Sequence, residues 1–407
     1  MTPAKGYTEM KDSGIEWIGA IPAHWDILRG KNVLRLLERP VKPEDDVVTC
    51  FRDGEVTLRK NRREEGFTNS LKEIGYQGIE PGDLIVHGMD GFAGAIGISD
   101  SRGKASPVLN VMDSNQNKRY LMYYLRAMAY KDVFMALSTG IRVRSCDLRW
   151  NKLSVFPFLI PTSHEQTAIA SYLDAQCAKI DEIIAQAKAS MEDYKQWKAS
   201  IIYEAVTKGL DPDVEMKDSG IEWIGRMPAH WTAPALKHLC TMQAGKNLIS
   251  EQISTSGQYP VYGGNGQRGY YSDYNANGNF LLVGRQGALC GNVHYVSGKF
   301  WATEHAVVTT PSKITNIRYL YYLLIAMDLN QYASNSAAQP GLSVGNILTV
   351  KTLLPPIGEQ VRISEFLDNC CPRIDEVITE KQSLIDDLES YKKSLIYEVV
   401  TGKRRVY

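Results

Sequence analysis

Two groups of hydrogen-bonding side chains stand in turn-like sequence, one in each half of this 407-residue chain. The first group is basic and contains Arg59, Lys60, Arg62, Arg63, Arg102, Lys104, Arg142, Arg144 and Arg149. The second group contains Lys246, Asn247, Asn265, Gln267, Arg268, Arg285, Gln286 and Gln339. Arginine pairs with guanine, and asparagine or glutamine with adenine, through two parallel hydrogen bonds, while lysine and arginine also anchor phosphates. Any one of these residues is most simply a solvated loop side chain, but the two sets together indicate a DNA-binding surface.

No pattern in the chain predicts catalysis. There is no GxxxxGK[ST] phosphate loop, no [DN]PP[FY] motif for a flipped base, and no glycine-rich cofactor loop between a strand and a helix. The seven histidines show no HxxxH or HExxH spacing, and no cluster of carboxylates with a lysine suggests a metal-dependent nuclease. His24 and His230 both occur in the tetrapeptide PAHW, which favours a structural role. We therefore predict no catalytic residue, no metal site and no cofactor in this chain.

An internal repeat organises the elements that must position these side chains. Residues 10–25 (MKDSGIEWIGAIPAHW) and 216–231 (MKDSGIEWIGRMPAHW) agree at 14 of 16 positions; we call each of them a box. The segment from Glu165 (EQTAIASYLDAQCAKIDEIIAQ) matches the segment from Glu359 (EQVRISEFLDNCCPRIDEVITE), at an offset of 194 residues. The chain is thus two copies of box, variable block and helical segment.

The helical segments predict a coiled coil. Apolar residues recur at alternating intervals of four and three, the heptad spacing of a paired helix. The positions that we expect to pair the helices are Leu173, Ile180, Ile184 and Met191 in the first copy and Leu367, Ile374, Ile378 and Leu388 in the second. Lys198, Lys381 and Lys392 interrupt these seams, as polar positions that set the register of a coiled coil often do. Pseudo-twofold symmetry between the copies would make the two helices antiparallel; the alternative is two long helices, each packed on its own domain.

The two blocks between box and helix predict a shared sheet fold with different surfaces. Short β-type runs alternate with Gly and Asn turns, and DLIVHGMDGFAGAIG in the first block aligns with FLLVGRQGALCGNV in the second. The helical runs YLMYYLRAMA and YLYYLLIAMD follow at matching places. The sequence predicts an α+β protein with four regions: a β-rich domain over 1–160, a helical region over 161–209, a second β-rich domain over 210–354 and a second helical region over 355–407.

Composition bounds the class of protein. Apolar residues make up 44% and charged residues 23% of the chain, as in globular proteins. No apolar run approaches the roughly 18 residues of a membrane span, the N-terminus lacks the apolar core of a signal peptide, and the seven cysteines include no CxxC pair. We expect a cytoplasmic protein with reduced thiols and no membrane partner. Net charge is zero, yet residues 26–160 carry 21 basic and 17 acidic side chains, and residues 232–354 carry eight and four. These two mildly basic blocks fit local contact with a polyanion.

The combination of motifs resembles the specificity subunit of type I restriction–modification enzymes over nearly the whole chain. The resemblance rests on the duplicated SGIEWIG and PAHW motifs, on GRQGALCGNV and TEHAVV in the second block, on PGDLIV in the first, and on the EQ and IDE entries to the helices. It implies two target recognition domains, each reading one half of an asymmetric bipartite site in double-stranded DNA, joined by two antiparallel conserved helical regions.

The resemblance also implies partners. Methylation subunits, two in number, would dock on the helical regions, and a restriction subunit would join through them. S-adenosylmethionine, ATP and magnesium would be bound by those partners, so that this chain is a non-catalytic recognition subunit. Two alternatives stay open from the residues: a specificity subunit that serves a stand-alone methyltransferase, and a two-headed scaffold that binds no DNA.

Overall fold

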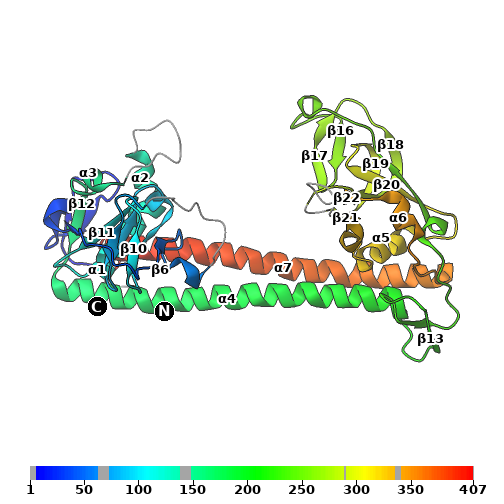
Figure 1. Cartoon of the computed structure of the whole chain (residues 1–407), viewed down its shortest axis with the longest axis horizontal. Helices are drawn as coiled ribbons and strands as arrows, with labels where there is room; N and C mark the ends of the chain where they lie inside the picture. Colours follow the sequence, from blue (N-terminus) through cyan, green and yellow to red (C-terminus); the bar gives the residue numbers. More distant parts are fainter. Residues whose placement is uncertain (1–5, 63–72, 138–147, 288–289, 335–340, 407) are drawn as a thin grey trace. The chain divides into compact units, whose positions relative to one another are not determined.

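The computed structural model describes residues 6–62, 73–137, 148–287, 290–334 and 341–406. The chain divides into two compact units, the first formed by residues 1–187 with 383–407 and the second by residues 188–382. Each unit contains one box, one β-rich head and a segment of each of two long helices (Figure 1). We call residues 26–160 the first head and residues 232–354 the second head.

The first unit is built from short strands around a central antiparallel sheet. The sheet has the strand order β4-β11-β8-β9, while β5 pairs with β6, β7 with β10 and β3 with β12. The strands of the first unit are β1 (Met10–Asp12), β2 (Ala20–Pro22), β3 (Asp26–Arg29), β4 (Arg35–Leu36), β5 (Val48–Cys50), β6 (Val56–Leu58), β7 (Gln77–Ile79), β8 (Leu84–His87), β9 (Ile96–Ile98), β10 (Gly103–Ala105), β11 (Leu109–Asp113) and β12 (Pro157–Ile160). Its short helices are η1 (Gly30–Asn32), η2 (Arg59–Asn61), η3 (Gly91–Ala93), α1 (Lys118–Tyr130), α2 (Val133–Ala136) and α3 (Trp150–Leu153).

The second unit carries a larger sheet with the order β15-β20-β18-β19-β16-β17, antiparallel except where β16 runs parallel to β19. Its strands are β13 (Met216–Asp218), β14 (Arg226–Pro228), β15 (Cys240–Ala244), β16 (Tyr259–Gly263), β17 (Gly266–Tyr271), β18 (Ala276–Gly284), β19 (Val293–Ala302), β20 (Ala306–Pro311), β21 (Ala333–Ser334) and β22 (Gly341–Leu342). Its short helices are η5 (Leu236–His238), η6 (Ser250–Gln252), α5 (Ile317–Ala326), η7 (Leu329–Tyr332) and α6 (Val344–Thr349).

The two heads contain separate sheets whose central strands are arranged in the same order. The order β4-β11-β8-β9 of the first head corresponds, strand for strand, to β15-β20-β18-β19 of the second. The predicted alignment of DLIVHGMDGFAGAIG with FLLVGRQGALCGNV places β8 and β9 on β18 and β19, as observed. Around this core the heads differ, because the first adds the β5–β6 and β7–β10 ribbons and the second adds the β16–β17 hairpin. The predicted α+β class, with two β-rich heads and two long helices, is confirmed.

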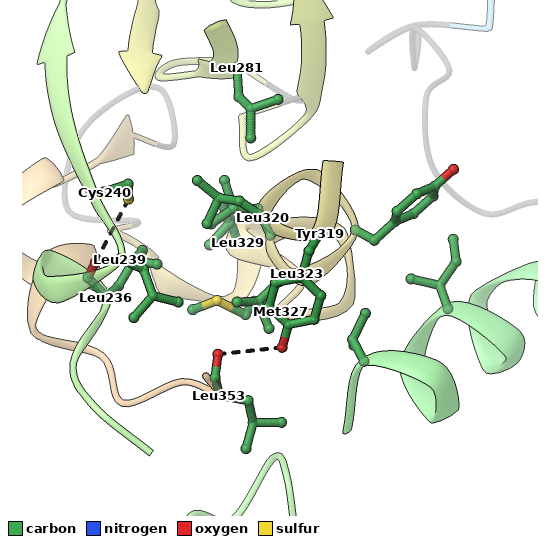
Figure 2. Packing of buried hydrophobic residues seen from close by; sticks show 14 of the residues in the cluster. Leu236, Leu239, Cys240, Leu281, Tyr319, Leu320, Leu323, Met327, Leu329 and Leu353 are labelled. Atoms are coloured by element: carbon green, nitrogen blue, oxygen red, sulfur yellow. Dashed lines mark hydrogen bonds between the residues drawn. The ribbon is translucent and has the colours of Figure 1, made fainter. Parts of the chain in front are cut away.

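The last four residues of strand β18, Leu281 to Gly284, are buried, and their side chains face two different cores, which explains the apolar run FLLVG. Leu281 and Val283 contribute to the core that includes helix α5, where Tyr319, Leu320 and Leu323 are fully buried (Figure 2). Leu282 points to the other side and packs with Phe300 and Val296. Successive side chains of a strand alternate between faces, so one run of three apolar residues serves both cores. Burying each such side chain stabilises the fold by about 1.5–3 kcal/mol.

The long helices are α4 (Ser163–Lys208) and α7 (Ile357–Val400), which lie side by side within each unit (Figure 1). The low-exposure positions repeat at intervals of four and three: Leu173, Cys177, Ile180, Ile184, Ala187, Met191, Tyr194, Lys198 and Ile201 on α4, and Leu367, Cys371, Ile374, Ile378, Lys381, Ile385, Leu388, Lys392 and Leu395 on α7. These positions include every residue predicted for helix pairing; Met191, Ile378 and Leu388 are half-buried and the others buried. Cys371 lies in this seam and, like its neighbour Cys370, carries a free thiol.

Ion pairs between the helices establish their direction. In the first unit, Asp181 of α4 pairs with Lys392 of α7, close to where α4 begins and α7 ends. In the second unit, Lys198 pairs with Asp375, close to where α4 ends and α7 begins. The helices are therefore antiparallel in both units. Among the described residues, no helix is both long enough and apolar enough to span a bilayer.

Candidate nucleic-acid interface

The repeated boxes contact the first turns of the long helices. His24 Nε2 lies 2.8 Å from Glu165 Oε1, and Trp25 donates its indole N–H to the same oxygen at 3.3 Å. Glu165 stands in the first turn of α4, where its other oxygen accepts hydrogen bonds from the backbone N–H and hydroxyl of Thr162. The second copy repeats this contact: His230 lies 2.7 Å and Trp231 2.9 Å from the carboxylate of Glu359, in the first turn of α7.

Each box also contacts the end of a second long helix: the first box contacts the end of α7, and the second box contacts the end of α4. Tyr397, near the end of α7, donates its hydroxyl to the carbonyl of Trp17 in the first box at 2.7 Å. Tyr203, near the end of α4, donates to the carbonyl of Trp223 in the second box at 2.9 Å. In each unit, one box thus fastens the beginning of one helix to the end of its antiparallel partner. The structural role predicted for the two PAHW histidines is confirmed by these contacts.

A second repeated set fixes the heads to the helices. Gln166 accepts the backbone N–H of Asn117, the N-cap of α1, at 2.9 Å, and Gln360 accepts that of Asn316, the N-cap of α5, at 2.7 Å. About two turns further along α4, Asp174 accepts two hydrogen bonds from Arg119 and one from the hydroxyl of Tyr123.

Asp368, Arg318 and Tyr322 repeat this arrangement in the second unit. The residues that the two copies share therefore attach each head to the long helices.

In the first head, a polar cleft of about 760 Å³ opens beside the β5–β6 hairpin. The predicted residues Arg59 and Arg62 line it, together with Arg52, which the sequence did not single out. Arg62 places its guanidinium 4.3 Å from the ring centroid of Phe51, and Arg59 donates to the hydroxyl of Thr49 at 3.3 Å. The structure thus gathers three arginines and one aromatic ring at one opening.

Carboxylates accompany these arginines. Arg62 Nη1 lies 2.7 Å from Asp53 and 3.2 Å from Glu55, and Arg52 Nη2 lies 2.8 Å from Asp90. His87, on the cleft wall, accepts the backbone N–H of Asp90 at 3.0 Å through Nδ1. Burial lowers the pKa of His87, against the opposing influence of Asp90, so the ring is neutral at pH 7.

Other predicted residues of the first head lie in intramolecular ion pairs. Arg102 donates two hydrogen bonds to Asp45, a carboxylate only 6% exposed, and also pairs with Glu80. Lys104 lies 2.7 Å from Glu73, and Lys60 lies 2.5 Å from Asp46.

Arg149 is exposed and forms the N-cap of α3. The predicted residues Arg63, Arg142, Arg144 and Gln339 lie outside the described residues.

In the second head, several predicted residues converge around residues 303–305. Lys246 donates its backbone N–H to Ala302 at 3.0 Å, and Arg285 donates its own to His305 at 2.9 Å. Asn265, in the turn between β16 and β17, accepts a hydrogen bond from Asn292 at 3.1 Å. A Cβ on Gly264 would lie within 3.0 Å of the His305 carbonyl, so glycine lets this turn approach the loop.

The remaining predicted residues of the second head, Asn247, Gln267, Arg268 and Gln286, are exposed. Gln286 forms an isolated β-bridge with Gly341. Within the part of the chain that the structure describes, no group of three or more His, Cys, Asp or Glu side chains is placed to hold a metal ion. What both heads present is a set of hydrogen-bond donors and acceptors on loops that a sheet supports.

Sequence reasoning missed Arg52, Phe51 and Asp90. A signal for Arg52 was present, because FRDG (51–54) is a turn sequence between two strand-like runs. The Gly54 N–H donates to the Phe51 carbonyl at 2.9 Å, and Gly54 has a φ of 86°. Asp90 belongs to a loop 38 residues from Arg52, and no local pattern links the two.

Comparisons with known proteins bear on this arrangement. Residues 228–385 match the family described as "Type I restriction modification DNA specificity domain". A stretch of 137 residues is 47% identical to the type I restriction enzyme EcoprrI specificity subunit of Escherichia coli, and spans 33% of this chain and 34% of that protein. The putative type I restriction enzyme MjaX specificity subunit of Methanocaldococcus jannaschii is 21% identical over 96% of each protein.

Solved structures share the fold. A chain from the structure described as "Structural basis underlying complex assembly and conformational transition of the type I R-M system" superposes with a TM-score of 0.72 at 14% identity, covering 93% of this chain and 98% of its own. The HsdS subunit of Thermoanaerobacter tengcongensis superposes with a TM-score of 0.50 at 13% identity, covering 97% of this chain and all of its own.

Proposed function

We propose that this chain is a specificity subunit of a type I restriction–modification enzyme, the non-catalytic DNA-recognition component of such a system, because residues 228–385 match the family and a stretch of 137 residues is 47% identical to such a subunit. It recognises an asymmetric bipartite site in double-stranded DNA, with one head for each half-site. It also docks two methylation subunits, and a restriction subunit joins through them.

One observation supports the two-headed part of this proposal: the contacts that attach the heads to the long helices are the same in both units, whereas the loops of the two heads differ. Glu165 and Glu359 make equivalent contacts with the two boxes, and Asp174 and Asp368 make equivalent contacts with the two heads. The shared sheet cores then carry different loops, β5–β6 in the first head and β16–β17 in the second. Identical heads would favour a palindromic site, whereas heads mounted alike with dissimilar loops favour two unrelated half-sites.

Docking of methylation subunits is supported by a pair of exposed aromatic side chains. Trp197 on α4 is 55% exposed and Tyr391 on α7 is 43% exposed, and the repeat offset of 194 residues relates these two positions. Exposed aromatic residues are enriched at the energetic centres of protein interfaces. Equivalent positions in the two copies suit two copies of one partner, since each partner would meet the same surface.

The chemistry then resides in the partners. S-adenosylmethionine is bound by the methylation subunits, and ATP and magnesium are used by the restriction subunit. This chain determines which DNA sequence the complex binds. The complex acts on DNA in the cytoplasm.

The test is to express this chain with its methylation subunits in a host that lacks other methylases and to map modified bases. We expect one asymmetric bipartite motif. Replacing residues 26–160 with the block of a relative should change one half of that motif and preserve the other. Absence of a modified motif, a palindromic motif, or a swap that changes both halves contradicts the proposal.

A further inference from the structure

The cleft of the first head is assembled from segments that are separate in sequence. One wall is the β5–β6 hairpin with its turn at residues 51–54 and the adjoining η2 helix. The other wall includes His87, the last residue of β8, and Asp90 in the loop that follows. Two of its arginines, Arg52 and Arg62, are each oriented by carboxylates. The hydrogen-bond donors that these two guanidinium groups keep unbonded, and the charges around them, indicate what kind of ligand can bind in the cleft.

Arg62 is held on three sides. Asp53 and Glu55 lie 2.7 Å and 3.2 Å from Nη1, and the face of Phe51 supports the guanidinium plane at 4.3 Å. Nevertheless 36% of the side chain is exposed. A guanidinium has five N–H donors, so a group held through Nη1 keeps donors on Nε and Nη2 for a ligand. Because its direction is already set, Arg62 loses less conformational freedom on binding than a solvated arginine does.

Arg52 is held in a similar way on the neighbouring turn. Asp90 lies 2.8 Å from its Nη2, and 61% of the Arg52 side chain is exposed. The loop that provides Asp90 is braced by its backbone N–H, which donates to His87, and by the 3.3 Å bond from the Ala95 N–H to the Asp90 carbonyl. A second pre-oriented fork of donors therefore faces the same cleft.

The charge balance distinguishes a base from a phosphate as the ligand. Asp53, Glu55 and Asp90 balance the charges of the three arginines at the cleft, Arg52, Arg59 and Arg62, so an incoming phosphate would meet no excess of positive charge and three like charges at short range. Like charges brought together where water is partly excluded oppose binding. The major-groove edge of guanine is uncharged and presents two acceptors, O6 and N7, which match the paired donors of an oriented guanidinium.

We propose that Arg62 and Arg52 are sequence-reading residues of the first head, each pairing with the acceptor edge of a guanine, and that their carboxylate partners hold them in the reading position. This inference rests on the proposed function and deepens it, because it names the residues that read one half-site and the base class that they read. It also separates these arginines from Arg102, whose donors are bound to Asp45 and Glu80.

The test uses the complete complex of this chain with its methylation subunits. Binding to a DNA library randomised over the target motif is measured for wild type, Arg62→Ala and Arg52→Ala, at several salt concentrations. Each variant should lose discrimination at one guanine of the half-site read by the first head, by roughly 5- to 150-fold, the range for one bidentate pair. The other half-site and the slope of affinity against salt should stay unchanged.

Arg35→Ala is the matched control. Arg35 is exposed, pairs with Asp113 at 2.9 Å, and is not among the residues that line the cleft, so this variant removes the same charge from the same head. It should not alter the preferred sequence. A thermal melt of each variant checks that the head is folded, and Arg62→Lys retains the charge without the fork, so it should also relax the preference for guanine.

Asp53→Asn gives an independent readout. The amide retains an oxygen for the Glu55 N–H, which donates to Asp53 at 3.1 Å, but removes one negative charge beside Arg62. We expect affinity for unrelated DNA to rise, because a like charge is lost, while discrimination at the guanine falls, because Arg62 is held less firmly.

Two results overturn the inference. Uniform weakening on all sequences, with a salt slope shallower by about one, identifies a phosphate contact instead. Unchanged sequence preference in both arginine variants removes any reading role. Either result leaves the proposed function standing when the wild-type complex still selects a bipartite motif; failure of the wild type to select one is failure of the proposed function.

Discussion

Lys198 on α4 places its ammonium 2.6 Å and 2.7 Å from the two carboxylate oxygens of Asp375 on α7. The repeat offset relates this pair to Lys392 and Asp181, whose atoms lie 2.6 Å apart. Both lysines occupy seam positions that would hold apolar residues in an uninterrupted heptad pattern. Each lysine thus extends across the seam to a carboxylate on the flank of the opposite helix, and the pairing is met only in one antiparallel register.

This geometry predicts a modest stabilisation and a larger effect on register. In a double-mutant cycle with Lys198→Ala and Asp375→Ala, the coupling energy should be about 0.5 kcal/mol at low salt, because Lys198 is 28% and Asp375 54% exposed. Thermal melts at low and high salt measure it, and the coupling should shrink as salt screens the pair. A coupling that is zero at low salt contradicts a direct pair. Lys198→Leu should raise the melting temperature while weakening the preference for one register.

The grip of the first box on α4 predicts a pH-dependent contribution to stability. Burial opposes ionisation of Glu165, but hydrogen bonds from His24, Thr162 and Trp25 outweigh it and hold the pKa of this carboxyl below its usual value near 4.5. A carboxyl with a lowered folded-state pKa stabilises the protein above the unfolded-state pKa, and this contribution is lost as pH falls through the folded value.

Glu165→Gln should therefore cost about 1–2 kcal/mol at pH 7, and the difference from wild type should shrink as the pH falls through the lowered pKa of Glu165. Urea titrations at a series of pH values measure this. Glu182→Gln, an exposed position on the same helix, is the control and should change stability by less than about 0.5 kcal/mol. If the loss of unfolding free energy in Glu165→Gln is the same at pH 3 as at pH 7, the ionised carboxylate of Glu165 is not the source of the stabilisation.

The end of α7 meets the first box so closely that only glycine fits. Gly402 has a φ of 72°, and a Cβ there would lie 2.2 Å from Cδ of Pro22 and 3.3 Å from Trp25. Gly19 has a similar φ of 71° with nothing within 4 Å of the added carbon. Gly19→Ala should cost about 1–2 kcal/mol from backbone strain alone, and Gly402→Ala should cost clearly more. Equal costs in chemical unfolding would show that the contact with Pro22 yields without penalty.

Arg102 is predicted to stabilise the first head through Asp45. Arg102→Gln leaves a buried carboxylate without its bidentate partner, which should cost about 2–3 kcal/mol. Arg35→Gln, which affects an exposed pair, should cost less than about 1 kcal/mol. The measurement is the melting temperature of each variant. A stable Arg102→Gln protein that has lost DNA affinity would instead assign this arginine to the DNA-binding surface.

Trp197 offers a test of partner docking that is separate from DNA binding. Trp197→Ala should weaken binding of a methylation subunit by about 2 kcal/mol, or roughly 30-fold, while changing the stability of the chain by less than about 0.5 kcal/mol. Titration calorimetry with the purified methylation subunit measures the affinity. Tyr391→Ala should weaken binding in the same way, and Lys195→Ala, two residues from Trp197 and exposed, should not. Unchanged affinity in both aromatic variants places the docking surface elsewhere.

The sequence alone established the scaffold, because its signals are local or repeated. The heptad spacing from Leu173 to Ile201 identified the buried and half-buried positions of α4, and the copied segments identified the strands that occur in both heads. The near-identity of the two boxes distinguished the shared attachment segments from the blocks that differ between the copies. These features depend on periodicity along the chain and on comparison of the chain with itself, and both can be read without coordinates.

The tertiary structure decided which polar side chains meet. His24 and Glu165 are 141 residues apart, and Arg102 and Asp45 are 57 apart. An arginine can bind a base, a phosphate or a carboxylate. Which of these it binds depends on the group that lies within about 3 Å, and folding brings that group from a distant part of the chain. For that reason Arg102 and Arg62 appear equivalent in sequence, yet Arg102 is bound to buried Asp45, whereas Arg62 pairs with the exposed carboxylates of Asp53 and Glu55 and lines a cleft.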